Sequence, residues 1–250
     1  MDQPGHTDPR PGSTPQPRPE IETHLIKDVK SLKRRVCEEA TTAVGMLESA
    51  LAALWELDTA AAREVADRDE RIDREEVAIE EAAFRIMTLQ QPVAREFRAL
   101  AFVLKVNSDI ERVGDHASTV AKTAIKLSQA APPGFNWPTA LLELGQRVPM
   151  ACHALLRALL DEDPDAAKSI VVGDKAIDRL TRELFDETVK FMETFPKAHA
   201  AGLLIYRIGR ELERVGDLMT NIAEDIVYLT TGEIIRHEKK RLRAELNSRE

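Results

Sequence analysis

Apolar residues recur along most of the chain at steps of three and four positions, which is the period of an amphipathic helix. In the first such stretch they are Leu25, Val29, Leu32, Val36, Ala40, Ala43, Leu47, Ala50 and Leu54. A second stretch follows Asp58, a residue type that caps helices, and ends before Pro92. A third runs from about residue 93 to residue 130. We therefore expect three long helices in the first half of the chain.

The stretch APPGFNWP at residues 131–138 breaks this pattern with three prolines and a glycine. After it, the apolar period predicts helices over about residues 139–160, 164–195 and 197–230. Pro164 follows Asp163, which is a favourable helix start, and Gly232 suits a helix end. We expect Pro149 to kink or interrupt the fourth helix. Met46, Met150 and Met219 lie in apolar stripes and are predicted to be core residues.

The second half of the chain repeats the first. The letters ERVGD occur at residues 111–115 and again at 213–217. A shift of 105 residues places Asp69, Ile72 and Asp73 on Asp174, Ile177 and Asp178, and a shift of 102 aligns the apolar stripes of the third and sixth helices. The prediction is an all-α fold of two tandem three-helix bundles, with six long helices. The expected boundaries are 1–20 for an N-terminal tail, 21–131 and 139–232 for the two bundles, 132–138 for a linker and 233–250 for a charged C-terminal helix or tail.

Composition narrows the class of protein. Aromatic residues make up only 4% of the chain, so the core is expected to be aliphatic. The formal net charge of −8 argues against a nucleic-acid binder, which usually presents a basic face. The first twenty residues contain six prolines and no apolar run, which predicts a disordered tail rather than a signal peptide. No stretch approaches 18 apolar residues, so we expect a cytoplasmic protein without membrane insertion.

Carboxylates gather at helical spacing in both repeats. Positions four apart share a helical face, so Glu111 lies beside Asp115, and Glu213 beside Asp217. Asn107 extends the first of these stripes, and Asn221 and Asp225 are plausible extensions of the second. On the middle helices the first repeat has Asp69, Asp73, Glu76 and Glu80, and the second has Asp174 and Asp178 followed by Thr181 and Phe185.

Two neighbouring helices with carboxylates on their facing flanks would surround a hard cation with oxygen ligands, and Mg²⁺, Mn²⁺ or iron would suit them. Like charges at this spacing repel each other, and a shared cation would relieve the repulsion. Gly114 and Gly216 each cost about 1 kcal/mol against alanine in a helix interior, which suggests a close approach there. Ordinary surface ion pairing, for example with Arg112, remains the alternative.

These segments resemble the PhoU family of phosphate-transport regulators. The most specific parts are SDIERVGDHA at 108–117 and RELERVGDLMTNIAEDIVYL at 210–229, with DERID at 69–73 and DKAID at 174–178, and the resemblance covers about residues 21–232. It implies multinuclear metal clusters of iron or zinc, or bound magnesium or manganese. The implied ligands are Glu111, Asp115, Glu213, Asp217, Asp69, Asp73, Asp174 and Asp178, with Asn221 and Asp225 as additions. Thr181 and Phe185 depart from the first repeat and put equal metal loading in doubt.

The resemblance also implies a role. It predicts a cytoplasmic negative regulator of phosphate uptake that couples a phosphate ABC transporter, through its ATPase subunit, to a membrane sensor histidine kinase. It further implies a homodimer. None of these partners follows from composition or spacing alone.

An enzyme is not expected. A ferritin-like di-iron oxidase needs Glu-x-x-His on facing helices, and none of the six histidines has an acidic residue three positions earlier. The sequence contains neither a GxxxxGK[ST] phosphate loop nor a GxSxG nucleophile elbow. A helical scaffold or dimeric adaptor without any metal remains the second interpretation.

Overall fold

The computed structural model describes residues 19–236, with side chains from residue 24 onward. Within this range the chain is all helical and contains no strand, which confirms the predicted all-α class. The helices are α1 (Pro19–Glu56), α2 (Thr59–Ala66), α3 (Asp69–Gln90), α4 (Ala94–Ala130), α5 (Thr139–Asp161), α6 (Pro164–Thr194) and α7 (His199–Thr231). The predicted N-terminal tail and most of the charged C-terminal segment lie outside the described residues, except that Pro19 and Glu20 already belong to α1.

The second predicted helix is two helices. At Asp67 and Arg68 the backbone ladder changes from bonds four residues apart to bonds three residues apart: Asp67 N donates to Arg63 O, whereas Arg68 N donates to Val65 O at 3.1 Å. Asp58 caps α2, as expected, by accepting from two backbone N–H groups. In the second repeat α6 runs without this break, so the two repeats differ here.

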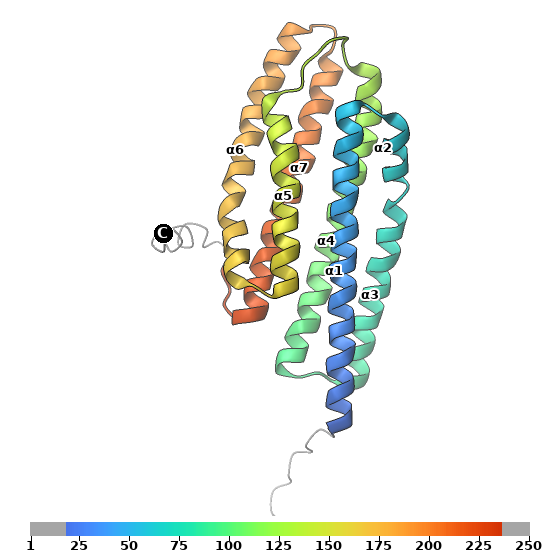
Figure 1. Cartoon of the computed structure of the whole chain (residues 1–250), viewed down its shortest axis with the longest axis vertical. Helices are drawn as coiled ribbons and strands as arrows, with labels where there is room; N and C mark the ends of the chain where they lie inside the picture. Colours follow the sequence, from blue (N-terminus) through green and yellow to red (C-terminus); the bar gives the residue numbers. More distant parts are fainter. Residues whose placement is uncertain (1–18, 237–250) are drawn as a thin grey trace, which may run out of the picture.

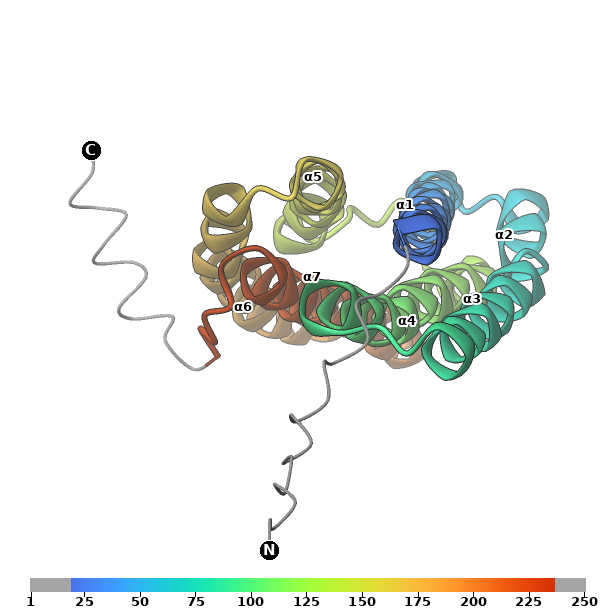
Figure 2. The same cartoon turned by 90° about the horizontal axis from the view of Figure 1, so that it is seen from below.

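Helices α4 and α7 form the centre of the molecule. Each packs against the other and against the remaining helices of its own repeat, and α1 also contacts α5. Figure 2 shows α4 and α7 side by side, with α1 and α5 over the same side of them and α3 and α6 at the two outer edges. Along its length the molecule is an elongated bundle (Figure 1). The two repeats therefore meet mainly through their last helices, α4 and α7.

Two ion pairs cross between these central helices. His116 Nδ1 lies 2.7 Å from Glu211 Oε2, and Lys105 pairs with Asp225. As the α4 residue advances from 105 to 116, its partner on α7 recedes from 225 to 211, so the helices are antiparallel. Between these pairs both helices carry buried aliphatic residues, including Ile110, Val113, Leu212 and Val215.

The linker between the repeats is anchored by aromatic rings. Trp137 packs edge-on against Trp55 of α1, with ring centroids 5.2 Å apart, and Phe135 packs against both Trp137 and Phe191 of α6. A β-carbon on Gly145 would overlap the ring of Trp55. A cluster of five aromatic side chains, which also includes Phe195, thus holds one end of the bundle together, while the core along its length is mainly aliphatic.

The structure tests two expectations about α5. Pro149, buried near the middle of the helix, does not interrupt it. Met150, predicted to be a core residue, is 70% exposed, whereas Met46 and Met219 are buried as expected. Met150 faces a groove that no described helix covers. Gly232 ends α7 in a left-handed conformation, with φ of 76°, as predicted.

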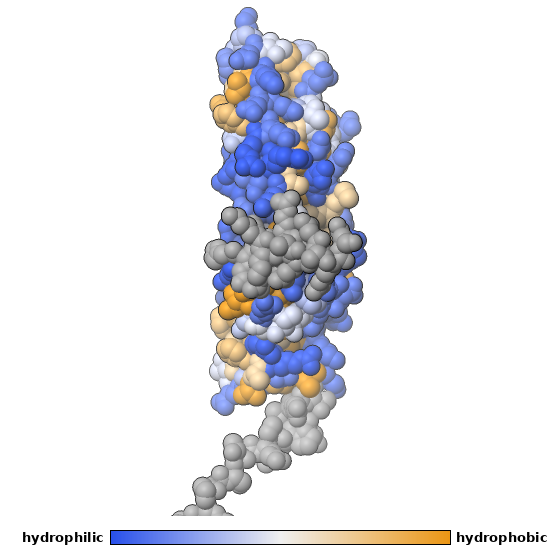
Figure 3. Space-filling view, turned by 90° about the vertical axis from the view of Figure 1, so that its left-hand side faces the viewer, coloured by the Kyte–Doolittle hydropathy of each residue, from blue (hydrophilic) through white to orange (hydrophobic). Residues whose placement is uncertain are grey.

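The outer faces are rich in charge. Figure 3 shows one side of the molecule as mostly hydrophilic, with separate apolar patches between the charged groups. None of the described helices combines the length and the apolar character needed to cross a membrane.

Candidate metal centre

In each repeat a glycine on the last helix, α4 or α7, contacts an isoleucine of the helix before it, α3 or α6. A β-carbon on Gly114 would lie 2.8 Å from Cδ1 of Ile72, and one on Gly216 would lie 3.0 Å from Cδ1 of Ile177. The close approach expected at these glycines is therefore made by a neighbouring helix rather than by a ligand. This contact holds α3 close to α4 and α6 close to α7. The carboxylates on either side of the isoleucine therefore lie opposite those on either side of the glycine.

We call the carboxylates of α3 and α4 the first centre; they are Asp69, Asp73, Glu76, Glu80, Glu111 and Asp115. Burial, and after it repulsion from Asp115, Glu76, Asp73 and Asp69, raises the pKa of Glu111 to about 7. The pKa of Asp115 is raised by burial and then by Asp69 and Asp73. The structure thus brings these predicted site residues into one electrostatic group on facing helices.

Basic side chains neutralise little of the first centre. Lys122 lies 3.4 Å from Asp69, and both side chains are partly exposed. The alternative of ordinary surface ion pairing does not hold for Arg112 and Asp115, because Arg112 pairs with Asp109 instead, at 3.8 Å. Repulsion among the carboxylates therefore persists in the folded protein.

Sequence reasoning missed Glu39 of α1, which lies at the inner end of the first centre. Its side chain is buried, and its pKa is raised to about 8 by burial and by repulsion from Glu75, Glu76 and Glu111, against the attraction of Arg35. The signal was visible as a charged residue within the apolar stripe of Val36 and Ala40.

The carboxylates of α6 and α7 form the second centre, which consists of Asp174, Asp178, Glu213 and Asp217. Asp174 is only 4% exposed, and its Oδ1 would lie 3.7 Å from a β-carbon on Gly216. Burial raises the pKa of Glu213; an ion pair with Arg210 opposes this, and Asp217 and Asp178 add repulsion. This centre has fewer carboxylates than the first and contains an arginine.

The positions that continue the acidic line in the first repeat are not acidic here. Thr181 is buried and donates to the carbonyl of Ile177 at 3.1 Å, and Phe185 packs against Tyr206 with ring centroids 5.7 Å apart.

Asp225 does not belong to the second centre. Its buried carboxylate pairs with Lys105 of α4 and with Arg236, whose Nη2 lies 3.4 Å away. The prediction that Asp225 extends the acidic stripe is therefore corrected, because the side chain points into the contact between α4 and α7. Asn221 is exposed on α7, one turn beyond Asp217.

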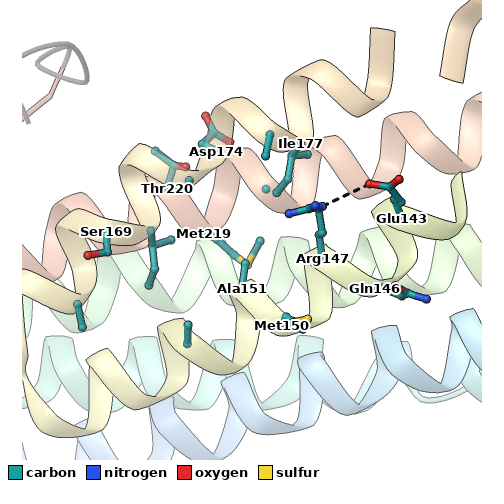
Figure 4. Close-up of a pocket in the computed structure, with 16 residues that line it drawn as sticks. Glu143, Gln146, Arg147, Met150, Ala151, Ser169, Asp174, Ile177, Met219 and Thr220 are labelled. Carbon is teal, nitrogen blue, oxygen red and sulfur yellow. Dashed lines mark ion pairs between the residues drawn. The ribbon is translucent and has the colours of Figure 1, made fainter. Parts of the chain in front are cut away.

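A groove runs beside the second centre, between α5, α6 and α7 (Figure 4). Its volume is about 880 Å³, and Asp174, Ile177 and Thr220 line one wall while Met150 lies on the other side. Arg147 pairs at 3.7 Å with Glu143, which lies one turn earlier on the same helix, α5. Asp174 is thus the one carboxylate of the second centre that lines this groove.

The donor set suits hard cations, since carboxylate oxygens are the ligands that Mg²⁺, Mn²⁺ and ferric iron prefer. As the described side chains stand, however, no three His, Cys, Asp or Glu residues converge closely enough to hold a metal ion. Binding would require the carboxylates to rotate toward one another. Burial is the main cause of the raised pKa values at Glu111, Asp115 and Glu213, and repulsion from neighbouring carboxylates, which a cation would relieve, adds to it.

Comparison with known proteins gives one consistent result. A family model described as "PhoU domain" matches the chain twice, over residues 36–124 and 141–226. A "Phosphate-specific transport system accessory protein PhoU homolog" of Deinococcus radiodurans is 37% identical over 169 residues, which is 68% of this chain and 78% of that protein. The homolog of the same name from Pseudomonas aeruginosa is 34% identical over 193 residues, or 76% of this chain and 78% of that protein.

Solved structures agree. The regulatory protein PhoU of the phosphate transport system from Streptococcus pneumoniae superposes with a TM-score of 0.76 at 26% identity, covering 86% of this chain and 98% of that one. PhoU from Pseudomonas aeruginosa gives a TM-score of 0.71 at 29% identity, covering 86% and 99%. Both matches extend over nearly the whole of the known structures.

Proposed function

Because the chain belongs to the PhoU family, we propose that it regulates phosphate uptake and represses the phosphate-starvation response when phosphate is abundant. Relatives named as accessory and regulatory proteins of phosphate transport support this role. The protein works in the cytoplasm as a homodimeric adaptor without a catalytic step. One partner is the ATPase subunit of the phosphate ABC transporter, and the other is the sensor histidine kinase of the phosphate two-component system.

The two centres bind metal in this proposal. Magnesium, manganese, iron or zinc would be held by Glu111 and Asp115 with Asp69 and Asp73 in the first centre, and by Glu213 and Asp217 with Asp174 and Asp178 in the second. The metal would supply positive charge between the middle and third helix of each repeat. The observation that supports this best is the repetition of the glycine–isoleucine contact together with its flanking carboxylates in both repeats.

A metal-free helical scaffold is the second candidate. It is favoured by the ion pair of Glu213 with Arg210, which already neutralises part of the second centre, and by the lack of converging ligands among the described residues. Direct measurement of bound metal separates the two candidates.

The test combines four substitutions, Glu111→Ala, Asp115→Ala, Glu213→Ala and Asp217→Ala. If the two centres bind metal, this variant should retain much less manganese than the parent after incubation with Mn²⁺ and dialysis. Its helix content should equal that of the parent. A matched control replaces four exposed carboxylates elsewhere, Glu64, Glu81, Asp161 and Glu193, by alanine. Equal manganese content in parent and site variant would leave only the scaffold.

The regulatory role is tested separately in cells that lack the protein. In abundant phosphate we expect high alkaline phosphatase output and excess phosphate accumulation, because repression is lost. Restoration by the parent gene completes the test. Unchanged phosphatase output in the deletion strain would refute the regulatory role whatever the metal content of the protein.

A further inference from the structure

One end of the molecule carries basic and apolar side chains together on its surface. It consists of the start of α1, the end of α3, the turn after α3 and the start of α4, and Figure 1 shows these segments projecting beyond the turn between α5 and α6. Gln90 of α3 joins two of them, since its Nε2 donates to Oδ2 of Asp28 of α1 at 2.6 Å. We call this surface, formed by residues 24–34 and 84–98, the basic end.

The charge of the basic end is opposite to that of the whole chain. Its two segments contain seven lysine and arginine residues and only two acidic residues, Asp28 and Glu96, in a chain with a formal net charge of −8. Lys33 and Arg34 lie in ion pairs. The other five cations are exposed and form no ion pair with another described residue; they are Lys27, Lys30, Arg85, Arg95 and Arg98. Positive charge is therefore concentrated at this end.

Large apolar side chains are exposed among these cations. Leu89 is 74% exposed and Val93 is 72% exposed, which are the highest values among the large apolar side chains that the structure describes. The two residues stand on either side of the turn between α3 and α4. Phe84 of α3 and Phe97 of α4 are also exposed. Exposed apolar side chains that gather in one place usually mark a surface that binds a protein or a membrane.

The equivalent turn of the second repeat is covered. Phe195, between α6 and α7, packs against Phe191 with ring centroids 5.1 Å apart, and Phe191 packs against Phe135 of the linker. The 105-residue shift places Thr194 at the position of Leu89. The shared fold of the two repeats therefore does not require an exposed leucine at this turn.

We propose that the basic end docks the protein peripherally on a membrane that contains anionic phospholipids. The lysine and arginine side chains attract the negative headgroups, and Leu89 and Val93 enter the headgroup region without any helix crossing the bilayer. The pattern favours lipid over an acidic protein, because the cations come from three helices around a projecting turn. A protein would need a carboxylate matched to each cation, whereas headgroups supply negative charge at every position. The inference does not rest on the proposed metal centres or on the regulatory role.

The test is co-sedimentation of the full-length protein with vesicles of phosphatidylcholine alone, or of equal amounts of phosphatidylcholine and phosphatidylglycerol. The parent should bind the mixed vesicles and not the neutral ones, and salt should weaken the binding because it screens the charges. Arg95→Gln with Arg98→Gln should weaken binding to the mixed vesicles by roughly tenfold or more. As the matched control, Lys175→Gln with Arg182→Gln removes two exposed cations of α6 and should bind like the parent.

A second variant tests the apolar side chains. Leu89→Ser with Val93→Ser changes no charge and should also weaken binding to the mixed vesicles, by roughly tenfold. Because the substituted side chains are exposed, both variants should keep the helix content of the parent.

Two results would overturn the inference. If the parent leaves the mixed vesicles unbound at low salt, the basic end does not dock on lipid, and an acidic protein becomes its partner instead. If both variants of the basic end bind like the parent, the binding comes from elsewhere, for example from the basic run HEKKRLR at 237–243. Neither result affects the manganese and phosphatase tests of the proposed function.

Discussion

Gly114 of α4 lies so close to Ile72 of α3 that a β-carbon at residue 114 would be 2.8 Å from Cδ1 of Ile72. This contact determines how near the carboxylates of the two helices come. Gly114→Leu should therefore separate α3 from α4 and destabilise the protein by about 1–3 kcal/mol, the usual cost of overpacking. Urea unfolding measures the loss. Mn²⁺ binding by the first centre should weaken in the same variant.

Gly173 provides the matched control. It lies in the middle of α6, exposed, and no atom lies within 4 Å of the position of its β-carbon. Gly173→Ala should stabilise the protein by up to about 1 kcal/mol, because alanine is the better helix former. If Gly114→Leu were instead as stable as the parent, α3 and α4 would not be in the close contact described.

The ion pair of His116 with Glu211 should contribute to the stability of the joined repeats. The Glu211 side chain is 7% exposed, and His116 Nδ1, at 2.7 Å, is its nearest partner, while Arg214 and Arg207 lie 3.5 and 3.9 Å away. His116→Leu, which copies Leu218 at the equivalent position, leaves a buried carboxylate without its closest hydrogen bond. We expect a loss of about 1–3 kcal/mol in the free energy of unfolding.

The same pair predicts a dependence on acid. Burial raises the pKa of Glu211, but the hydrogen bond and charge of His116 and the two arginines outweigh it, so the pKa is lowered overall from the ordinary value of 4.5. The folded protein thus favours the carboxylate. Its contribution is present above pH 4.5 and is lost as the pH falls through the lowered pKa. Unfolding measured between pH 3 and 6 should show a shallower acid loss for Glu211→Gln than for the parent; an equal slope would contradict the prediction.

The helices were predictable because every one of them carries an apolar stripe of helical period. The internal repeat supported the same prediction independently, since both halves of the chain show the same order of stripes. The break between α2 and α3 was not, because Asp67 and Arg68 include neither glycine nor proline and the change is a local shift in hydrogen bonding. Met150 was misjudged for another reason. Periodicity identifies an apolar face but does not say whether another helix covers it.

The placement of the candidate carboxylates was predictable where their spacing is short. Asp69 and Asp73, like Glu111 and Asp115, are one turn apart and remain on one face. The prediction for Asp225 was wrong because each four-residue step turns the side chain by about 40° around the helix axis. Three such steps from Glu213 turn it by about 120°, toward α4. Glu39 was hidden by its own stripe, since an acidic residue in an apolar face is recognised only when its neighbours from α3 and α4 are known.

Glu39 leads to the last prediction, which concerns the protein without metal. Burial and the repulsion of Glu75, Glu76 and Glu111 raise its pKa from 4.5 to about 8. Between these two pH values the folded protein holds a proton that the unfolded chain releases, so stability should fall as the pH rises from about 4.5 to 8. The full loss from this one group is on the order of 3–5 kcal/mol.

Glu39→Gln, which resembles the protonated acid at every pH, should remove that part of the slope and be the more stable protein at pH 8. Urea unfolding in EDTA at pH 5.5 and pH 8 measures the difference, with Glu38→Gln as the exposed control. A parent protein equally stable at both pH values, or a Glu39→Gln variant with the parent's slope, would mean that Glu39 is ionised in the folded state without cost, and that the inner end of the first centre is better solvated than its burial indicates.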